Sequence, residues 1–132
     1  MSKIIKQVIL IRRDLRLKKA SIAAMAAKMS SKFIFDNNLS ERSDILQVEL
    51  TLQEAEWLAG PETRIVLGVS SENALKSLVL KAELAGLSCC TLTSASQEEE
   101  MKNDFMEEVI CASIGPDEAE KIDEITGNLR LI

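Results

Sequence analysis

Residues 7–11 read QVILI, a short, continuous apolar run that is rich in β-branched side chains. Such a run is typical of a strand buried on both faces, because neither face has to stay polar. Arg12, Arg13 and Asp14 follow as the predicted loop at the end of this strand. Three further apolar runs predict strands, namely RIVLGV (64–69), SCCTL (88–92) and VICASI (109–114).

The longest predicted helix runs from about Leu17 to Phe35. Its apolar residues recur at helical spacing and form one stripe made of Ile22, Met25, Ala26, Met29 and Phe33. Ser21, Lys28 and Lys32 share a polar stripe on another side of this helix. The next residues, 39–50, have an ambiguous pattern that assigns them to no single element.

Three shorter helices are predicted further along the chain, at 51–59, after Ser71 as far as Gly86, and at 117–126. In the first, Thr51 and Glu54 have the spacing of a capping box, in which each residue satisfies a free backbone N–H of the other. Trp57 is expected to pack this helix on the core. Gly115 and Pro116 are expected to turn the chain before the last helix.

The predicted order of elements is βααβαββα in a single domain that spans residues 1–132. Helices long enough to cross over lie between the early strands, which favours parallel and right-handed connections there. A sheet whose strands are buried on both faces needs a helical layer on each side. The sequence therefore predicts an α/β fold, a three-layer α/β/α sandwich with a mixed four-stranded sheet.

The composition limits the classes of function. The chain has 132 residues, contains no histidine and carries a net charge of −5. No apolar run reaches the ~20 residues that a membrane span needs, so a cytoplasmic protein without a membrane partner is expected. Its three cysteines show no CxxC spacing, which argues against a metal site, and no cofactor is predicted. Cys89 and Cys90 are expected to point to opposite faces of a strand.

Charge is distributed unevenly along the chain. Residues 1–32 contain nine lysines or arginines and one acid, whereas residues 97–124 contain eleven acids and two bases. Such a distribution can present a basic face in spite of the acidic total. The acidic stretch 97–108 lacks the alternating pattern of an EF-hand loop and is expected to be solvated, although a regulatory role stays open.

Several of these segments together resemble the type 2 peptidyl-tRNA hydrolase family. The similar segments, in order, are Lys6–Leu17 (KQVILIRRDLRL), Ile22–Ala24 (IAA), Leu84–Leu92 (LAGLSCCTL), Ile114–Pro116 (IGP) and Lys121–Leu131 (KIDEITGNLRL). The resemblance implies a mixed four-stranded α/β/α sandwich, a homodimer and tRNA as a partner. It also implies hydrolysis of the ester that joins a peptide to the 3′ end of a tRNA.

The resemblance is weakest where the family carries its chemistry. Lys19 matches one lysine of the family's Gly-Lys-Gly-Lys turn, but Lys18, Ala20 and Ser21 replace the other three positions. The family's helix glutamine is Met25 here and its usual histidine is Lys28. Where the family has an Asp-Ala-Gly turn after the third strand, this chain reads Ser94-Ala95-Ser96.

Lys19, Ser21 and Lys28 are the candidate catalytic residues. Lys19 follows a strand-end loop, where ligands bind in open α/β sheets, and could pair with a phosphate or an oxyanion. Ser21 and Lys28 are separated by about 10.5 Å of helix, which disfavours a Ser-Lys dyad and favours a basic strip for a phosphate backbone or an acidic partner. The candidate substrate-binding residues are Arg12, Arg13, Asp14, Arg16, Lys18 and Lys32.

Asp14 has two possible structural roles, because it could cap the helix that follows or orient Arg12, and capping is the expected one. For the whole chain, the leading hypothesis is a peptidyl-tRNA hydrolase-like protein with a degenerate active site that acts as a binding module or an altered hydrolase. A working peptidyl-tRNA hydrolase and a non-catalytic dimer that binds other proteins are the alternatives.

Overall fold

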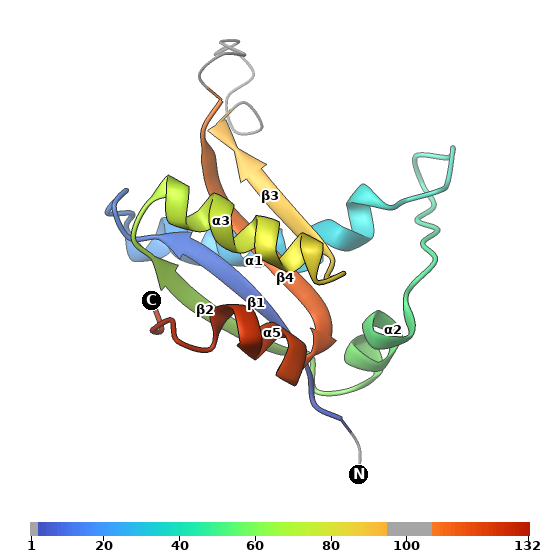
Figure 1. Ribbon diagram of the computed structural model, residues 1–132. Coiled ribbons are helices and arrows are strands. Elements are labelled where there is room, and N and C mark those ends of the chain that lie inside the picture. Colours follow the sequence, from blue (N-terminus) through green and yellow to red (C-terminus); the bar gives the residue numbers. More distant parts are fainter. Residues whose placement is uncertain (1–2, 95–106) are drawn as a thin grey trace.

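The computed structural model describes residues 3–94 and 107–132. At its centre lies a four-stranded sheet in the order β2-β1-β4-β3 (Figure 1). The strands are β1 (Ile5–Arg12), β2 (Thr63–Val69), β3 (Cys89–Thr93) and β4 (Val109–Glu118). β1 pairs with β2 in parallel, whereas β4 is antiparallel to both β1 and β3. The predicted mixed four-stranded sheet is therefore confirmed.

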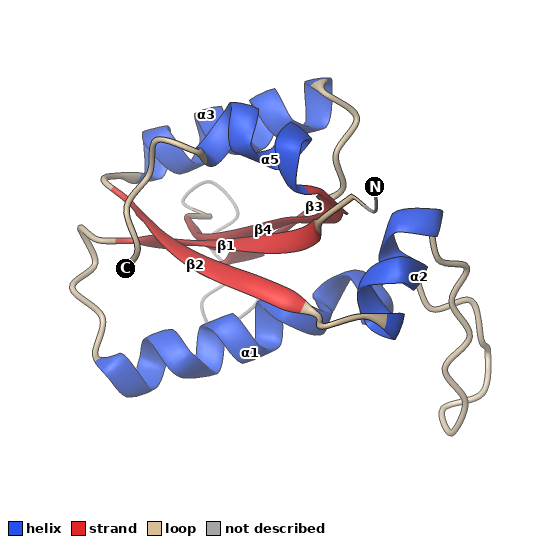
Figure 2. Cartoon of the chain, turned by 90° about the horizontal axis from the view of Figure 1, so that it is seen from below, coloured by secondary structure: helices blue, strands red, loops and turns tan. Residues whose placement is uncertain are grey.

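Helices cover both faces of this sheet. They are α1 (Lys19–Asp36), α2 (Leu52–Ala59), α3 (Glu72–Leu84) and α5 (Ala119–Thr126). Figure 2 shows α3 and α5 on one face of the sheet, with α1 and α2 on the other. None of the helices in the described part of the chain is long and apolar enough to cross a membrane.

The first strand runs through the middle of the core. Val8 and Leu10 pack under α3 and α5, while Ile9 and Ile11 pack over α1, and all four side chains are at most 1% exposed. Alternate side chains of a strand point to opposite faces, so both helical layers bury their apolar stripes against one short segment. The same alternation places Cys89 and Cys90 in the two separate core clusters, as predicted.

The capping box of α2 is also confirmed. The Thr51 hydroxyl accepts a hydrogen bond from the Glu54 N–H at 3.1 Å, and the Glu54 carboxylate accepts one from the Thr51 N–H at 2.9 Å. Trp57, which is 2% exposed, packs edge-on against Phe33 with ring centroids 6.0 Å apart. Its indole N–H donates to the Thr63 carbonyl at 2.9 Å, so the buried ring keeps no unpaired polar atom.

The expectation that Gly115 and Pro116 turn the chain is wrong. β4 continues through both residues to Glu118, and α5 begins only at Ala119. The pairing register between β1 and β4 shifts at this point, so the two residues form an irregularity inside the strand. Gly115 has a φ of +88° and its N–H donates to the Ser88 carbonyl at 2.8 Å. The glycine thus allows a local distortion that leaves the sheet continuous.

The two edges of the sheet differ. The C-terminal residues run along β2, where Gly68 N–H donates to the Arg130 carbonyl at 2.9 Å and Leu67 lies opposite Leu131. Arg13 fastens this segment by donating to the Arg130 and Leu131 carbonyls. On the other edge, no described residue forms a ladder with the outer side of β3.

Between α1 and α2 the chain passes through residues 37–51 without a helix or a paired strand, and this segment projects away from the sheet (Figure 2). It contains the stretch 39–50, which the sequence left ambiguous. Several large apolar side chains are exposed on it or beside it: Phe35, Leu39, Ile45, Leu46, Leu50 and Leu52.

Candidate active site

Five chain segments meet at one end of the sheet, where strands finish or begin. The carboxyl ends of β1 and β3, the first residues of β4, and the first turns of α1 and α3 all lie there. β1 and β3 run in the same direction because each is antiparallel to β4, so their carboxyl ends lie at the same end of the sheet. Ligands of open α/β sheets bind at the carboxyl ends of the strands, and most of the candidate residues from the sequence lie there.

Arg12 is the buried charge at this end of the sheet. Its side chain is 5% exposed, and its Nε and Nη2 donate to the two Asp14 carboxylate oxygens at 3.0 and 2.6 Å. Its Nη1 donates to Glu108 at 2.6 Å and to the Val109 carbonyl at 3.0 Å. The hydrogen bonds that Arg12 donates to Asp14 are the main cause of its raised pKa, and the same contact lowers the pKa of Asp14. Four of the five guanidinium N–H groups are thus used inside the protein.

The expectation that Asp14 caps the following helix is wrong. Lys18 is the N-cap residue of α1, and no side chain forms a hydrogen bond at this cap. The Asp14 carboxylate is bound by Arg12 from both oxygens instead. A planar guanidinium matches a carboxylate in two parallel bonds, which is a stronger contact than one capping bond to a backbone N–H.

A short network joins the end of β3 to the start of β4. Ser94 N–H donates to the Glu108 carbonyl at 2.8 Å, and the Ser94 hydroxyl accepts from the Glu108 N–H at 3.1 Å. The Thr93 hydroxyl donates to the Glu107 carboxylate at 2.6 Å. Both glutamates belong to the acidic stretch that was expected to be solvated, and both make specific bonds. Residues 95–106, which include Ala95, Ser96 and most of that stretch, lie outside the described residues.

Glu72 is a further site residue, one that no motif in the sequence marks. It is the first residue of α3, and its carboxylate accepts a hydrogen bond from the Val109 N–H at 2.8 Å. This bond is the main cause that lowers the pKa of Glu72, and Lys76 acts in the same direction. The contact spans 37 positions in the sequence, so only the position after Ser71, a predicted N-cap, could have marked the residue.

Replacing Glu72 by Gln is expected to reduce the loss in free energy of unfolding that the protein shows as the pH falls into the acid range. A carboxylate whose pKa is lowered by folding stabilises the protein above its unfolded pKa, near 4.5, and loses that contribution as the pH falls. The amide can still accept the Val109 N–H, so the loss at neutral pH should be about 1 kcal/mol. Urea unfolding at several pH values from 7 to acid tests this, with exposed Glu124→Gln as control. Parallel pH curves for Glu72→Gln and the parent would contradict the assignment.

The candidate lysines lie outside this network. Lys18 and Lys19 are exposed at the start of α1, and Ser21 and Lys28 are exposed further along the helix. Within residues 3–94 and 107–132, no acid lies within ion-pair distance of Lys18, Lys19, Lys28 or Arg16. Ser21 and Lys28 form no hydrogen bond with each other. Lys32 pairs with Asp36, one turn along the helix, at 2.9 Å.

The cysteines are poor candidates for a nucleophile. Burial raises the pKa of Cys89 to about 12 and that of Cys111 to about 11, and it also raises the pKa of Cys90. A thiol with so high a pKa is protonated at neutral pH, and the thiolate is the reactive form. No group of three or more metal-ligating side chains occurs in the described part of the chain. The available chemistry therefore consists of exposed cations beside a closed set of ion pairs.

Comparison with known proteins identifies one family over nearly the whole chain. The family model described as peptidyl-tRNA hydrolase PTH2 matches residues 5–132. The chain is 33% identical to the peptidyl-tRNA hydrolase of Haloquadratum walsbyi over 126 residues, which is 96% of this chain and 98% of the relative. It is 31% identical to that of Metallosphaera sedula over 128 residues, 96% and 99% of the two chains.

A solved structure of a protein of unknown function from Agrobacterium tumefaciens superposes with a TM-score of 0.58 at 11% identity, covering 100% of this chain and 99% of that one. At this identity the similarity shows a shared fold alone. The family match, by contrast, covers both the strand-end loop at Arg12 and the C-terminal segment on β2. The resemblance noted in the sequence is thereby confirmed, and this chain belongs to the peptidyl-tRNA hydrolase PTH2 family.

Proposed function

We propose that this chain is a PTH2-family protein that binds tRNA-linked ligands and cleaves the peptide ester poorly, as a binding module or an altered hydrolase. One observation carries the proposal. No carboxylate in the described part of the chain lies within ion-pair distance of Lys19, and Asp14 and Glu108, the acids bound at the end of β1, are both held by Arg12. Activation of water needs a base with a free acceptor near the reacting carbonyl.

Exposed cations support the binding half of the proposal. Arg16, Lys18, Lys19 and Lys28 extend from the end of β1 along α1 and have no ion-pair partner among the residues that the structure describes. Free cations on one surface are what a phosphate backbone attracts. Arg12 supports this surface from within, since it is closed off by its own carboxylates, and Arg13 is occupied by the C-terminal carbonyls.

A working hydrolase is the second candidate. The names of the Haloquadratum and Metallosphaera relatives favour it, because both are peptidyl-tRNA hydrolases over nearly their full lengths. We further propose one domain over residues 1–132, a cytoplasmic location and a homodimer. A purely protein-binding role would be supported if tRNA fails to bind at low salt.

Replacing Lys19 and Lys28 together by Ala is expected to weaken tRNA binding and to flatten its dependence on salt. Each phosphate contact releases counterions, so the slope of log affinity against log salt should fall in magnitude by about two contacts' worth, roughly 1.5 to 2. Binding of labelled tRNA is measured from low to moderate salt. The control is Lys76→Ala with Lys81→Ala, which removes two exposed cations from α3 on the opposite face of the sheet.

Two results would contradict this binding surface. One is the absence of tRNA binding by the parent at low salt. The other is an equal salt slope for the parent and the Lys19/Lys28 variant, with a change only in the α3 control. Either result would favour the protein-binding alternative over recognition of a nucleic acid.

A further inference from the structure

Residues 45–50 have the side-chain pattern of a strand but no strand partner within the chain. Leu46, Val48 and Leu50 alternate with Gln47 and Glu49, the pattern of a half-buried strand. The structure places this segment outside every helix and sheet strand, with Leu46 49% and Leu50 38% exposed. These apolar side chains are exposed to water, and burying them against a second surface would stabilise them.

The backbone of this segment is satisfied on one side only. Gln47 N–H donates to the Asn38 side chain at 2.9 Å, and the Gln47 carbonyl accepts from the Leu39 N–H at 2.7 Å. Neighbouring residues of an extended chain direct their backbone groups to opposite sides. Leu46 and Val48 therefore direct their N–H and C=O groups away from the Asn38 side, where an added strand could bind them.

The outer edge of β3 offers the matching groups. Ser88 accepts from Gly115, so Ser88 and Cys90 direct their backbone groups toward β4, and Cys89 and Thr91 direct theirs outward. β3 itself carries no charged residue and no proline, and no segment among residues 3–94 and 107–132 covers its outer side, whereas β2 is covered by the C-terminal residues. Within the described residues, β3 is the one edge of the sheet left for strand addition.

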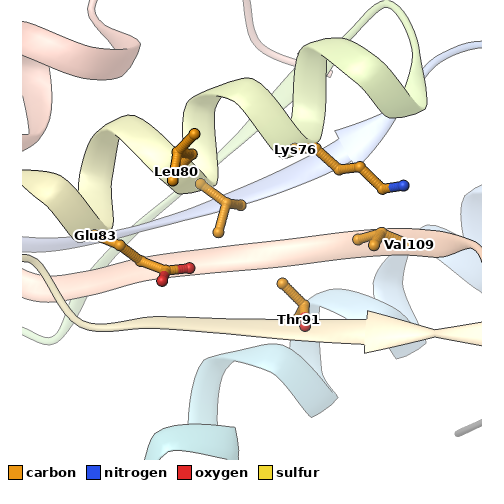
Figure 3. A pocket seen from close by; sticks show the side chains of 6 residues that line it. Lys76, Leu80, Glu83, Thr91 and Val109 are labelled. Carbon is orange, nitrogen blue, oxygen red and sulfur yellow. The ribbon is translucent and has the colours of Figure 1, made fainter.

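An apolar groove lies along this open edge. α3 contributes Lys76, Val79, Leu80 and Glu83 to it, with the two charged side chains at its ends, and the strands contribute Thr91 and Val109. Figure 3 shows Lys76, Leu80 and Glu83 along α3, with Thr91 and Val109 on the two strands that lie beneath the helix. The groove has a volume of about 210 Å³, and Leu80 at its rim is 58% exposed. It can therefore take apolar side chains that enter from an added strand.

We propose that residues 45–50 of one copy of this chain add as an antiparallel strand to the β3 edge of a second copy. Residues directly opposite each other in an antiparallel pair place their side chains on the same face of the sheet. Thr91 directs its side chain into the groove under α3, so Leu46, Val48 and Leu50 opposite this edge would enter the same groove. The pattern, the free backbone groups and the groove thus agree on one orientation.

Charge favours the same orientation. With the apolar side chains under α3, Gln47 and Glu49 face the opposite side of the sheet, where α1 contacts β3. α1 carries Lys28 and Lys32 on one polar stripe there. Lys32 is paired with Asp36 at 2.9 Å, so Lys28 is the cation of this stripe that has no ion-pair partner among the described residues. The second copy is therefore the occupant that the segment and the edge select.

The test compares variants of the full chain by light scattering coupled to size exclusion at high micromolar concentration. The parent is expected to have at least twice the 14.6 kDa chain mass. Leu50→Asp and Thr91→Pro should each have the mass of one chain. Proline at 91 removes an N–H that points outward, so β3–β4 pairing is kept. Leu39→Asp changes a leucine that lies outside the segment and is 57% exposed, so this control should behave like the parent.

A capped peptide with the sequence of residues 43–52 provides an independent readout. It should bind monomeric Leu50→Asp, whose β3 edge is intact, and it should not bind Thr91→Pro. A single-chain mass for the parent together with no peptide binding would overturn the proposal. A dimer that persists in both variants would also overturn it, because the interface would lie elsewhere. These outcomes do not depend on tRNA binding or ester cleavage and leave the proposed function untouched.

Discussion

Replacing Arg12 by Ala should lower the free energy of unfolding by about 3–4 kcal/mol, within the range found when one partner of a buried ion pair is removed. Arg12 is 5% exposed and donates to Asp14, Glu108 and the Val109 carbonyl. The substitution leaves that carbonyl without its donor and opens space where the arginine stem was packed. Asp14 and Glu108 are 37% and 42% exposed, so water can partly replace the lost bonds and the effect stays below the upper limit.

Urea unfolding at neutral pH measures this loss, and exposed Lys28→Ala serves as the control with an expected change within about 0.5 kcal/mol. The difference between parent and Arg12→Ala should shrink in acid. Arg12 lowers the pKa of Asp14, so the contribution of Asp14 is present above its unfolded pKa and is lost as the pH falls below about 3.8. An Arg12→Ala chain as stable as the Lys28→Ala control would show that the ion group contributes nothing.

The architecture followed from local patterns in the sequence. Val8 to Ile11 predicted a strand buried on both faces, and the two core clusters on either side of it confirm this. The capping box at Thr51 and the packing of Trp57 were also predicted correctly. Each of these features depends on residues close together in the chain, where periodicity and side-chain chemistry determine the structure.

The site was harder to predict because its contacts join distant parts of the chain. Arg12 and Glu108 are 96 positions apart, and Glu72 and Val109 are 37 apart. No local pattern shows which acid an arginine will select, so capping was expected for Asp14. The Gly115 turn failed for a related reason, since glycine and proline also occur at irregularities inside a strand when a neighbouring strand keeps the pairing.

Cleavage of peptidyl-tRNA by this chain should be at least about 100-fold slower than cleavage by the Metallosphaera sedula relative, a difference of ~2.7 kcal/mol in barrier. The resemblance to the family places an Asp-Ala-Gly turn where this chain has Ser94-Ala95-Ser96. The missing carboxylate could activate water or orient a base, and such groups typically contribute 10²- to 10⁴-fold. Turnover within tenfold of the relative would show that the chain is a working hydrolase.

Ser94→Asp tests whether that single carboxylate is the missing group. The Ser94 hydroxyl accepts the Glu108 N–H at 3.1 Å, and an aspartate can accept the same N–H while adding a second free oxygen at the end of β3. We expect at least a tenfold rise in the single-turnover cleavage rate, which is about 1.4 kcal/mol in the activation barrier, with unchanged tRNA affinity. Ser88→Asp places the same charge at the opposite end of β3 and should leave the rate unchanged. Equal rates for the two variants would mean that the chemistry is lost at Lys18, Ala20 or Met25 as well, so that the binding role is the one retained.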